Sequence, residues 1–337
     1  MALRVAINGF GSIGRALMSD AVHDPSIDIV DINDLGTVEN LAYLLKYDTV
    51  YRRFPGQVSC EPRFLIVGAK RIQVLSEKEP GQLPWKSLGI DVVVESTGFF
   101  ADYDKANAHV VAGAKHVVIT APVKDDNPLG ATVLMGLNEA QASTCPITSN
   151  ASCTTNSASP IIAILDESIG IERALLSTVH GYTATQAIVD GPSKKGMKEG
   201  RAAAQNIIPT STGAAIAVTK AYPNLAGKFD GVSLRVPVPA GSIADITFVP
   251  KRATTAEEVN KILRDAAASP RWQGIFTVTT DELVSSDIIG EPYASIADLG
   301  LTRVVEGLLV KVFAWYDNEM GYAHTLLRHI KAAGGHI

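Results

Sequence analysis

One cysteine stands where the sequence could build a nucleophile. Cys153 follows Ser149, Asn150 and Ser152, which are residue types that favour the N-cap of a helix, and an apolar helical run comes after it. A thiol in the first turn of a helix feels the positive end of the helix dipole, which lowers its pKa and raises the thiolate fraction. A small buried cysteine is the common alternative, but polar residues flank this one on both sides. The pattern therefore favours Cys153 as a nucleophile.

A histidine that could serve as its base ends a β-rich run. His180 closes the segment that begins at Leu175. A lone histidine at a strand end is usually structural, but cysteine nucleophiles commonly work with a base, so we predict that His180 is that base. The other histidines are interpreted as surface or packing residues: His23, His109, His116, His324, His329 and His336. With no H-x-x-x-H or C-x-x-C pair, no metal site is predicted.

A glycine-rich loop near the start predicts a dinucleotide site. Gly9-Phe10-Gly11-Ser12-Ile13-Gly14 fits G-x-G-x-x-G between a predicted strand and a predicted helix. Such glycines allow a tight turn and close approach of the backbone to a pyrophosphate at the helix N-terminus. Asp34, about 20 residues on, is placed to bind ribose hydroxyls and to repel a 2′-phosphate, which favours NAD. The alternative is a glycine-rich turn without a ligand.

Several polar and basic residues of the second half could hold phosphate. Thr212 and Gly213 precede a helix predicted from Ala214, which makes an anion-friendly terminus. Arg235 lies inside a β-rich run, so its charge must face solvent or an anion, and both remain open. A merely solvated loop is the alternative for the basic run. The other candidates are Thr183, Thr185, Lys194, Lys195, Lys198, Arg201, Thr210 and Ser211.

The elements that must position these residues divide the chain near residue 150. The first part alternates strands with helices, which predicts a Rossmann-type doubly wound parallel sheet in an α/β protein. Its predicted strands are 3–8, 27–33, 91–95 and 116–120, with a hairpin of 63–67 and 71–75, and its predicted helices are 12–21, 38–47 and 102–111.

The second part predicts an α+β catalytic domain with a largely antiparallel or mixed sheet. A long loop without periodicity, 181–210, is expected to be ordered and functional. We predict an NAD-binding domain of residues 1–150, completed by the C-terminal helix 319–337, and a catalytic domain of residues 151–318. The predicted strands are 175–180, 229–238, 242–249 and 308–316, and the predicted helices are 153–168, 256–268 and 319–332.

Composition excludes several classes of protein. The 337 residues are 46% hydrophobic and 19% charged, so a mainly disordered chain is excluded. The net charge of −5 argues against a dedicated nucleic-acid binder. Three sparse cysteines, Cys60, Cys145 and Cys153, indicate a reducing compartment. No apolar run is long enough to cross a membrane and no secretory signal is recognised, so we expect a cytoplasmic protein without a membrane partner.

Together these residues resemble the phosphorylating glyceraldehyde-3-phosphate dehydrogenase family from about residue 2 to about residue 330. The segment Ser149–Asn156 is close to diagnostic. The resemblance implies a homotetramer in which a loop at about 181–205 lines the neighbouring subunit's cofactor, and a final helix that returns to the Rossmann domain. Further matching segments are 8–11, 46–48, 95–98, 179–180, 190–193, 205–209, 211–215, 235–237 and 315–319.

The resemblance also implies an activity: reversible NAD-dependent conversion of D-glyceraldehyde 3-phosphate and inorganic phosphate to 1,3-bisphosphoglycerate. Its nucleophile falls on Cys153 and its base on His180. The implied ligands of the substrate's phosphate are Thr183 and Arg235, and those of inorganic phosphate are Ser152, Thr154, Thr212 and Gly213, with Lys198 or the nearby Arg201. The implied NAD contacts are Ser12 and Ile13 at the pyrophosphate, Asp34 at the ribose, Lys78 and Thr120 toward the adenine and nicotinamide halves, and Asn318 at the carboxamide.

Three positions depart from the family pattern, and other functions stay open. Ser12 and Lys198 replace arginines, and Ser157 replaces a second cysteine. Erythrose-4-phosphate dehydrogenase is the nearest alternative activity, although 183–186 and 190–193 fit the triose-phosphate branch better. A non-catalytic protein that binds RNA through the cofactor groove conflicts with the intact Cys153 and His180. A cysteine hydrolase has no need of the glycine loop.

Overall fold

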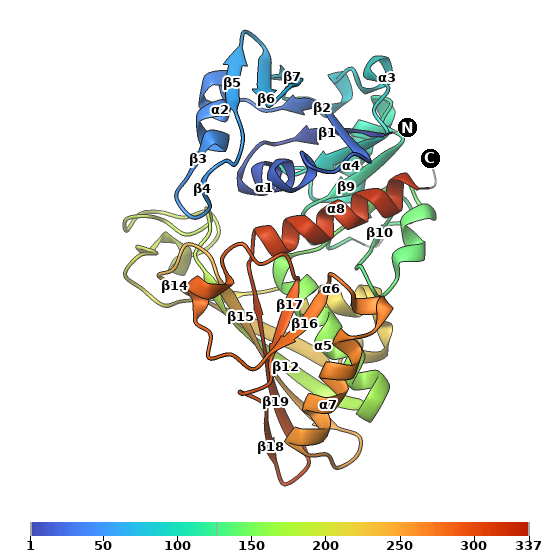
Figure 1. Cartoon of the computed structure of the whole chain (residues 1–337), viewed down its shortest axis with the longest axis vertical. Coiled ribbons are helices and arrows are strands. Elements are labelled where there is room, and N and C mark those ends of the chain that lie inside the picture. Colours follow the sequence, from blue (N-terminus) through green and yellow to red (C-terminus); the bar gives the residue numbers. More distant parts are fainter. Residues whose placement is uncertain (1, 126, 336–337) are drawn as a thin grey trace. The chain divides into compact units, whose positions relative to one another are not determined.

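The computed structural model describes residues 2–125 and 127–335, and contacts between Cα atoms divide them into two compact units. Unit 1 runs to Val133, continues over Asn138–Ala151 and ends with the chain from Leu326 onward. Unit 2 consists of Leu134–Leu137 and Ser152–Thr325. His336 lies outside the described residues, as does the end of the helix expected to reach 337. Figure 1 shows the elements of both units along the chain.

Unit 1 contains a nine-stranded sheet in the order β10-β11-β9-β8-β1-β2-β7-β6-β5. Every pair from β10 to β7 is parallel, and only the two pairs that join β7, β6 and β5 are antiparallel. The predicted doubly wound parallel sheet is thereby confirmed. The bounds are β1 Leu3–Asn8, β2 Ile27–Asn33, β5 Val58–Glu61, β6 Phe64–Val67, β7 Lys70–Leu75, β8 Val92–Glu95, β9 His116–Ile119, β10 Gly130–Thr132 and β11 Ile147–Ser149.

Two of the unit 1 helices begin with a polar N-cap residue. Thr37 accepts a hydrogen bond from Asn40 N before α2, and Asp102 accepts one from Lys105 N before α4. These caps satisfy backbone donors that a helix start leaves free. The bounds are α1 Ser12–Ala21, α2 Val38–Lys46, α3 Trp85–Leu88 and α4 Tyr103–Val111, with the short pair β3 Tyr47–Asp48 and β4 Arg52–Arg53 and the 3₁₀ turns η1 Pro80–Gln82 and η2 Glu139–Ser143.

Unit 2 contains an eight-stranded mixed sheet in the order β13-β14-β12-β15-β19-β17-β16, with β18 on β19. Strand β12 is parallel to β14 and antiparallel to β15, so the expected mixed sheet is confirmed. The bounds are β12 Ile171–Gly181, β13 Ile208–Ser211, β14 Phe229–Val236, β15 Ser242–Pro250, β16 Phe276–Thr279, β17 Ser295–Asp298, β18 Arg303–Val305 and β19 Leu309–Tyr316.

One face of the unit 2 sheet is covered by helices. Helix α5 contacts β12, β15, β17 and β19, while α7 contacts β16 (Figure 1). Most of α5 is buried, as its apolar sequence requires. The bounds are α5 Cys153–Ile169, α6 Ala214–Ala221 and α7 Ala256–Ala267, with the 3₁₀ turns η3 Lys198–Gly200, η4 Pro223–Leu225, η5 Pro270–Trp272 and η6 Ser285–Ile288. The last helix, α8 Met320–Gly334, begins in unit 2 and belongs to unit 1 from Leu326 onward.

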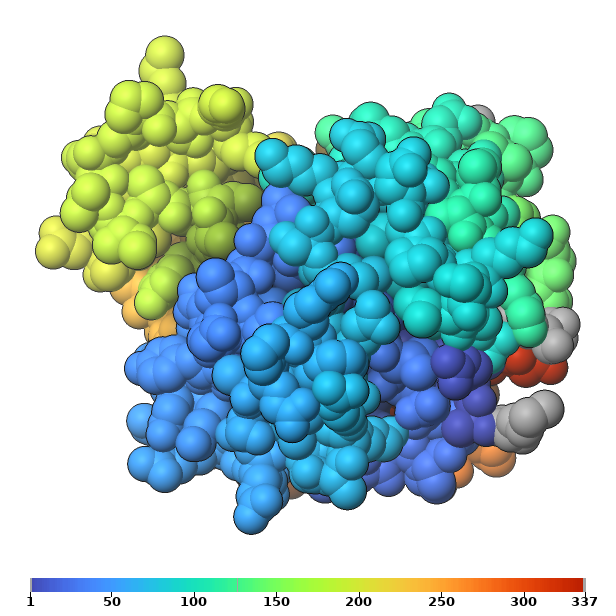
Figure 2. Space-filling model, turned by 90° about the horizontal axis from the view of Figure 1, so that it is seen from above, coloured from blue at the N-terminus to red at the C-terminus, as the bar shows by residue number. Residues whose placement is uncertain are grey.

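The long segment after β12 is ordered, as predicted. Backbone bonds join Ala187 N to Glu199 O and Gly191 N to Gly200 O, both at 2.8 Å. Asp190 pairs with Arg201 at 3.0 Å. Figure 2 shows this segment, in yellow-green, as a compact body of side chains. Its end forms β13, which sequence periodicity did not reveal.

Candidate active site

Cys153 is the first residue of α5, and Ser152 caps that helix. The Ser152 hydroxyl accepts a hydrogen bond from Thr155 N at 3.1 Å, so the predicted cap is confirmed. Ala151, just before it, has φ of +52°, a left-handed conformation that non-glycine residues rarely adopt. The turn directs the chain from β11 into α5 and leaves Cys153 partly exposed at the helix start.

His180 faces the cysteine from the end of β12. Its Nε2 lies 3.4 Å from Cys153 Sγ, and its Nδ1 lies 2.6 Å from Gly181 O. With its proton on Nδ1 and donated to Gly181 O, the neutral imidazole leaves Nε2 free to accept the thiol proton, whereas the Arg235 guanidinium beside the same Nδ1 can itself only donate. The structure thus brings together the predicted nucleophile and base.

Arg235 is the third member of this cluster. In the parallel register of β12 and β14 it lies opposite His180, and its Nη1 is 2.7 Å from His180 Nδ1. Burial, reinforced by the guanidinium charge, lowers the pKa of His180 to about 3. Burial raises the pKa of the Cys153 thiol, and Arg235 opposes that shift. The expectation that the helix start lowers the thiol pKa is therefore wrong, because desolvation outweighs that effect.

Two residues beside the pair were missed by sequence reasoning. Tyr316 is buried, its hydroxyl lies 2.9 Å from Thr154 Oγ1, and its ring packs edge-on against His180. Ser242 accepts from Gly181 N at 3.2 Å and donates to Asn318 Oδ1 at 2.9 Å. These contacts hold both ends of the Cys153–His180 pair. The only sequence signal was the matching segment 315–319, which contains Tyr316 and Asn318.

The candidate phosphate ligands differ in exposure and in their hydrogen-bond partners. Thr183 Oγ1 donates to Gln186 Oε1 at 3.1 Å, and Thr212 Oγ1 accepts from Ala214 N at 3.2 Å at the start of α6. Lys198 is exposed in η3, whereas Arg201 is occupied by Asp190. Contact of these side chains with phosphate stays a prediction.

Unit 1 contains a cavity of about 510 Å³ at the carboxyl ends of its central strands. Asp34 lines this cavity, and two hydrogen bonds orient its carboxylate. Oδ2 accepts from Phe10 N at 2.7 Å and Oδ1 accepts from Gly36 N at 2.8 Å. Ser12, Ile13 and Gly14 form the first turn of α1. The lining residues are Asn8, Gly9, Gly11, Asn33, Asp34, Leu35, Glu77, Lys78, Ser96, Thr97, Phe99 and Phe100.

The glycine loop fits a dinucleotide. A Cβ on Gly9, whose φ is +95°, would lie 2.8 Å from the Ser96 carbonyl carbon, and one on Gly14 would lie 2.5 Å from Gly9 O. A Cβ on Gly11 would meet nothing within 4 Å, so that backbone is open to a ligand. This division matches the glycine roles in dinucleotide loops: tight turn, phosphate approach and close packing.

Five of the predicted cofactor contacts do not line this cavity: Ser12, Ile13, Gly14, Thr120 and Asn318. Thr120 Oγ1 donates to Glu95 O at 3.1 Å. Asn318 belongs to unit 2, where it accepts from Ser242. Their contact with a cofactor stays a prediction.

Comparison with known proteins assigns both units. Residues 3–103 match a family described as glyceraldehyde 3-phosphate dehydrogenase, NAD binding domain, and residues 152–318 match its C-terminal domain. Glyceraldehyde-3-phosphate dehydrogenase 2 of Streptomyces arenae is 45% identical over 330 residues, which cover 97% of each chain. The chain belongs to the glyceraldehyde-3-phosphate dehydrogenase family. The glyceraldehyde-3-phosphate dehydrogenase of Zymomonas mobilis is 45% identical over 332 residues, 97% of each chain. The cytosolic one of Leishmania mexicana is 45% identical over 325 residues, 96% of this chain and 97% of the relative.

Residues 2–125 and 127–335 contain neither a membrane-spanning helix nor a cluster of metal ligands. None of the helices there is both long and apolar enough to cross a membrane. No group of three or more histidine, cysteine, aspartate or glutamate side chains in that part of the chain could hold a metal ion.

Proposed function

We propose that this chain is an NAD-dependent phosphorylating dehydrogenase of D-glyceraldehyde 3-phosphate that forms 1,3-bisphosphoglycerate reversibly. The observation that carries the proposal is the 3.4 Å contact of Cys153 Sγ with His180 Nε2 in a chain of this family. A cysteine hydrolase would need the same pair but not the dinucleotide cavity of unit 1.

The residues act in two half-reactions. His180 Nε2 takes the thiol proton as Cys153 attacks the aldehyde carbon and returns it to the aldehyde oxygen, which gives a hemithioacetal and restores the neutral imidazole. His180 then accepts the hemithioacetal hydroxyl proton as the carbon is oxidised to a thioester on Cys153. Bound NAD supplies the acceptor for the two electrons and the hydrogen lost from that carbon. Inorganic phosphate attacks the thioester, the C–S bond breaks, and the acyl phosphate leaves with Cys153 restored.

Arg235 and the polar residues near it are proposed to hold the phosphate groups. The positive charge of Arg235 lies 2.7 Å from His180 and opposes its protonation. A substrate phosphate bound to Arg235 offsets this charge, so His180 accepts a proton more readily. We assign Thr183 and Arg235 to the substrate's phosphate. The set assigned to inorganic phosphate is Ser152, Thr154, Thr212 and Gly213, with Lys198 or Arg201.

The cavity of unit 1 is proposed to hold the adenosine half of NAD. Asp34 is assigned to the ribose hydroxyls, since its carboxylate lies on the cavity wall. Lys78 lines the same cavity, and Ser12 and Ile13 present backbone N–H groups at the start of α1. Thr120 and Asn318 are assigned to the nicotinamide half from the family resemblance.

NADH formation tests the proposal. We expect NADH from glyceraldehyde 3-phosphate that depends on added inorganic phosphate, and none from Cys153→Ser, because a serine hydroxyl stays protonated near neutral pH. Measuring kcat/KM with erythrose 4-phosphate decides between the two aldehydes. A higher value for erythrose 4-phosphate, or NADH formation by Cys153→Ser within about tenfold of the parent, contradicts the assignment.

Subunits are proposed to associate as a homotetramer through the face of the unit 2 sheet opposite α5. Leu175, Val232 and Leu309 alternate along their strands with buried residues and are 64%, 52% and 45% exposed. Exposed aliphatic side chains grouped on one face are typical of a protein interface. A cytoplasmic location is supported by three free cysteines and by the cytosolic Leishmania relative.

A further inference from the structure

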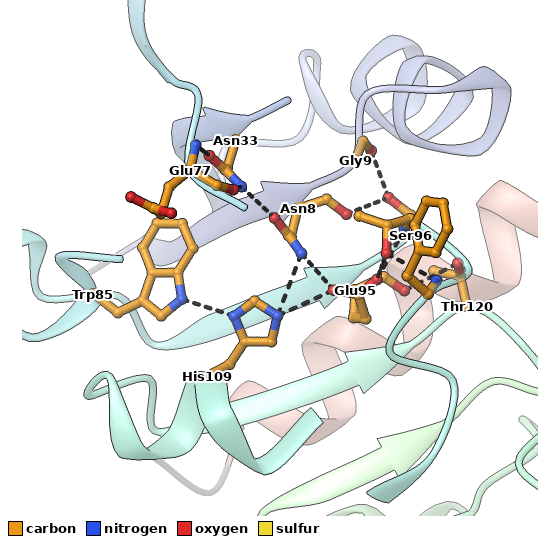
Figure 3. Close-up of polar contacts among 11 residues, drawn as sticks. Asn8, Gly9, Asn33, Glu77, Trp85, Glu95, Ser96, His109 and Thr120 are labelled. Atoms are coloured by element: carbon orange, nitrogen blue, oxygen red, sulfur yellow. Dashed lines mark hydrogen bonds and ion pairs between the residues drawn. The ribbon is translucent and has the colours of Figure 1, made fainter. Parts of the chain in front are cut away.

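A chain of buried hydrogen bonds runs behind the cavity of unit 1 (Figure 3). We infer that His109, which does not line the cavity, is a positioning residue for NAD binding and acts through Glu95. The inference rests on the proposed NAD role of the cavity. The hydrogen bonds of this chain have defined donors and acceptors, which link His109 to the cavity lining.

The donor and acceptor roles along this chain of hydrogen bonds follow from Trp85, whose indole nitrogen can only donate. Trp85 Nε1 donates to His109 Nδ1 at 2.9 Å, so this nitrogen must carry a lone pair. The proton of the neutral imidazole is then on Nε2, which lies 3.0 Å from Glu95 Oε2 and donates to it. Trp85 and His109 are fully buried and Glu95 is 2% exposed, so water does not replace these bonds easily.

Glu95 also fixes the loop that follows β8 through hydrogen bonds. Its Oε1 accepts from Thr97 N at 2.9 Å and also from the Thr97 hydroxyl. The same hydroxyl oxygen accepts from Phe99 N at 3.1 Å. Thr97 and Phe99 line the cavity, so the carboxylate determines the position of one cavity wall.

A second branch of hydrogen bonds leads to other residues of the cavity lining. Asn8 Nδ2 donates to Glu95 Oε2, and Asn8 Oδ1 accepts from Asn33 Nδ2 at 2.7 Å. Asn33 exchanges two bonds with the Glu77 backbone, at 2.8 and 2.9 Å. Asn8, Asn33 and Glu77 all line the cavity. Asn8 Nδ2 also lies 3.4 Å from His109 Nε2, where the two donors share the Glu95 oxygen.

Loss of the hydrogen bond from His109 to Glu95 should therefore make several lining residues of the cavity less well positioned. Glu95 accepts from four donors, and removing one lets its carboxylate turn away from Thr97 or Asn8. NAD affinity then falls because the walls must be reordered on binding. Cys153 and His180 belong to the other unit and keep their contact, so kcat at saturating NAD should change little.

Two substitutions at one position separate positioning from packing. In His109→Gln the side-chain amide nitrogen can occupy the place of Nε2 and still donate to Glu95. In His109→Asn the amide oxygen can occupy the place of Nδ1, so the bond from Trp85 is kept and the donor to Glu95 is lost. We expect His109→Asn to raise the NAD Kd about tenfold to hundredfold, the loss expected for one hydrogen bond to a charged group, and His109→Gln to raise it much less.

His116→Asn is the matched control. His116 is also a buried histidine of unit 1, but its Nε2 bonds to Thr148 Oγ1 at 2.9 Å, outside this chain of bonds. Calorimetric titration of each purified full-length protein with NAD gives the Kd, and steady-state assays give kcat and the NAD KM. We expect a Kd within about twofold of the parent for His116→Asn.

The outcomes are distinct. An NAD Kd that rises for His109→Asn, rises little for His109→Gln and leaves kcat unchanged supports the inference. Equal effects of the two His109 variants, or effects no larger than that of His116→Asn, overturn it. If His109→Asn does not fold, Glu95→Gln replaces one acceptor oxygen with a donor and must raise the NAD Kd. Failure of the parent protein to bind NAD contradicts the proposed function instead.

Discussion

His180 is held between a nucleophile, a carbonyl and a cation, and this setting defines what its removal should do. Nε2 faces Cys153 at 3.4 Å while Nδ1 faces Gly181 O and Arg235. In His180→Asn no group remains at the position of Nε2 to accept the protons. We expect kcat for NADH formation to fall about 10²- to 10⁴-fold, the usual contribution of a general base, with NAD affinity retained. A kcat within about threefold of the parent means that another group serves as base.

Asp34 is the residue on which cofactor choice should depend. Its carboxylate accepts from Phe10 N and Gly36 N, so it is both oriented and negatively charged at the cavity wall. A 2′-phosphate there meets charge repulsion, and we expect kcat/KM for NAD to exceed that for NADP. Asp34→Asn removes the charge and keeps one acceptor oxygen, which should narrow the ratio of the two kcat/KM values by about tenfold or more. An unchanged ratio assigns cofactor choice to other residues.

Among the elements, β2 contains a buried carboxyl group. Asp31 is fully buried, and neither oxygen has a hydrogen-bond partner among the described residues. Burial raises its pKa from 3.8 to about 8. In the unfolded chain the group ionises near its ordinary value, so the folded form binds more protons than the unfolded form between about pH 4 and pH 8. This residue therefore makes the free energy of unfolding fall as pH rises through that range, and the effect levels off above pH 8.

Asp31→Asn should remove this pH dependence. We expect similar thermal stability for variant and parent near pH 4, below which the carboxyl is protonated in both the folded and the unfolded parent. Near pH 8 the variant should be more stable by roughly 2–5 kcal/mol, the order of the linkage free energy for a shift of this size. Thermal unfolding at both pH values measures the difference. Equal melting temperatures at pH 8 contradict a buried, protonated Asp31.

The short elements show where local sequence carries too little information. β3 and β4 have two residues each, and β10 and β18 have three, so no alternation of apolar and polar residues can develop in them. The longer strands and helices were predicted to within a few residues. α5, for example, was predicted over 153–168 and spans Cys153–Ile169.

For the whole molecule, the exposed face of the unit 2 sheet should determine subunit association. A carboxylate in the middle of an apolar interface loses its hydration without gaining a partner. We therefore expect Val232→Asp to shift a tetramer to smaller species in sedimentation velocity. Val111→Asp is the control, since Val111 is 77% exposed on α4 of the other unit. Sedimentation of Val232→Asp as the parent does places the interface elsewhere.

Features that depend on neighbours along the chain could be predicted from the residues alone. The turn Gly9–Gly14 between strand and helix, the Ser152 cap before Cys153 and the β-rich run that ends at His180 each depend on contiguous residues. Local backbone preferences act over a few positions, so their residue types are sufficient evidence. The resemblance to a family added the roles of residues that no local pattern connects.

Contacts between distant residues, and the effect of burial on their pKa values, depend on the tertiary fold. His109 and Glu95 are 14 positions apart, Arg235 and His180 are 55 apart, and Tyr316 and Thr154 are 162 apart. His109 was interpreted only as a surface or packing residue, because its spacing shows neither Trp85 nor Glu95. The direction of the Cys153 pKa shift also depends on tertiary structure. Desolvation comes from the packing of distant segments around the sulfur, and it outweighs the local effect of the helix start.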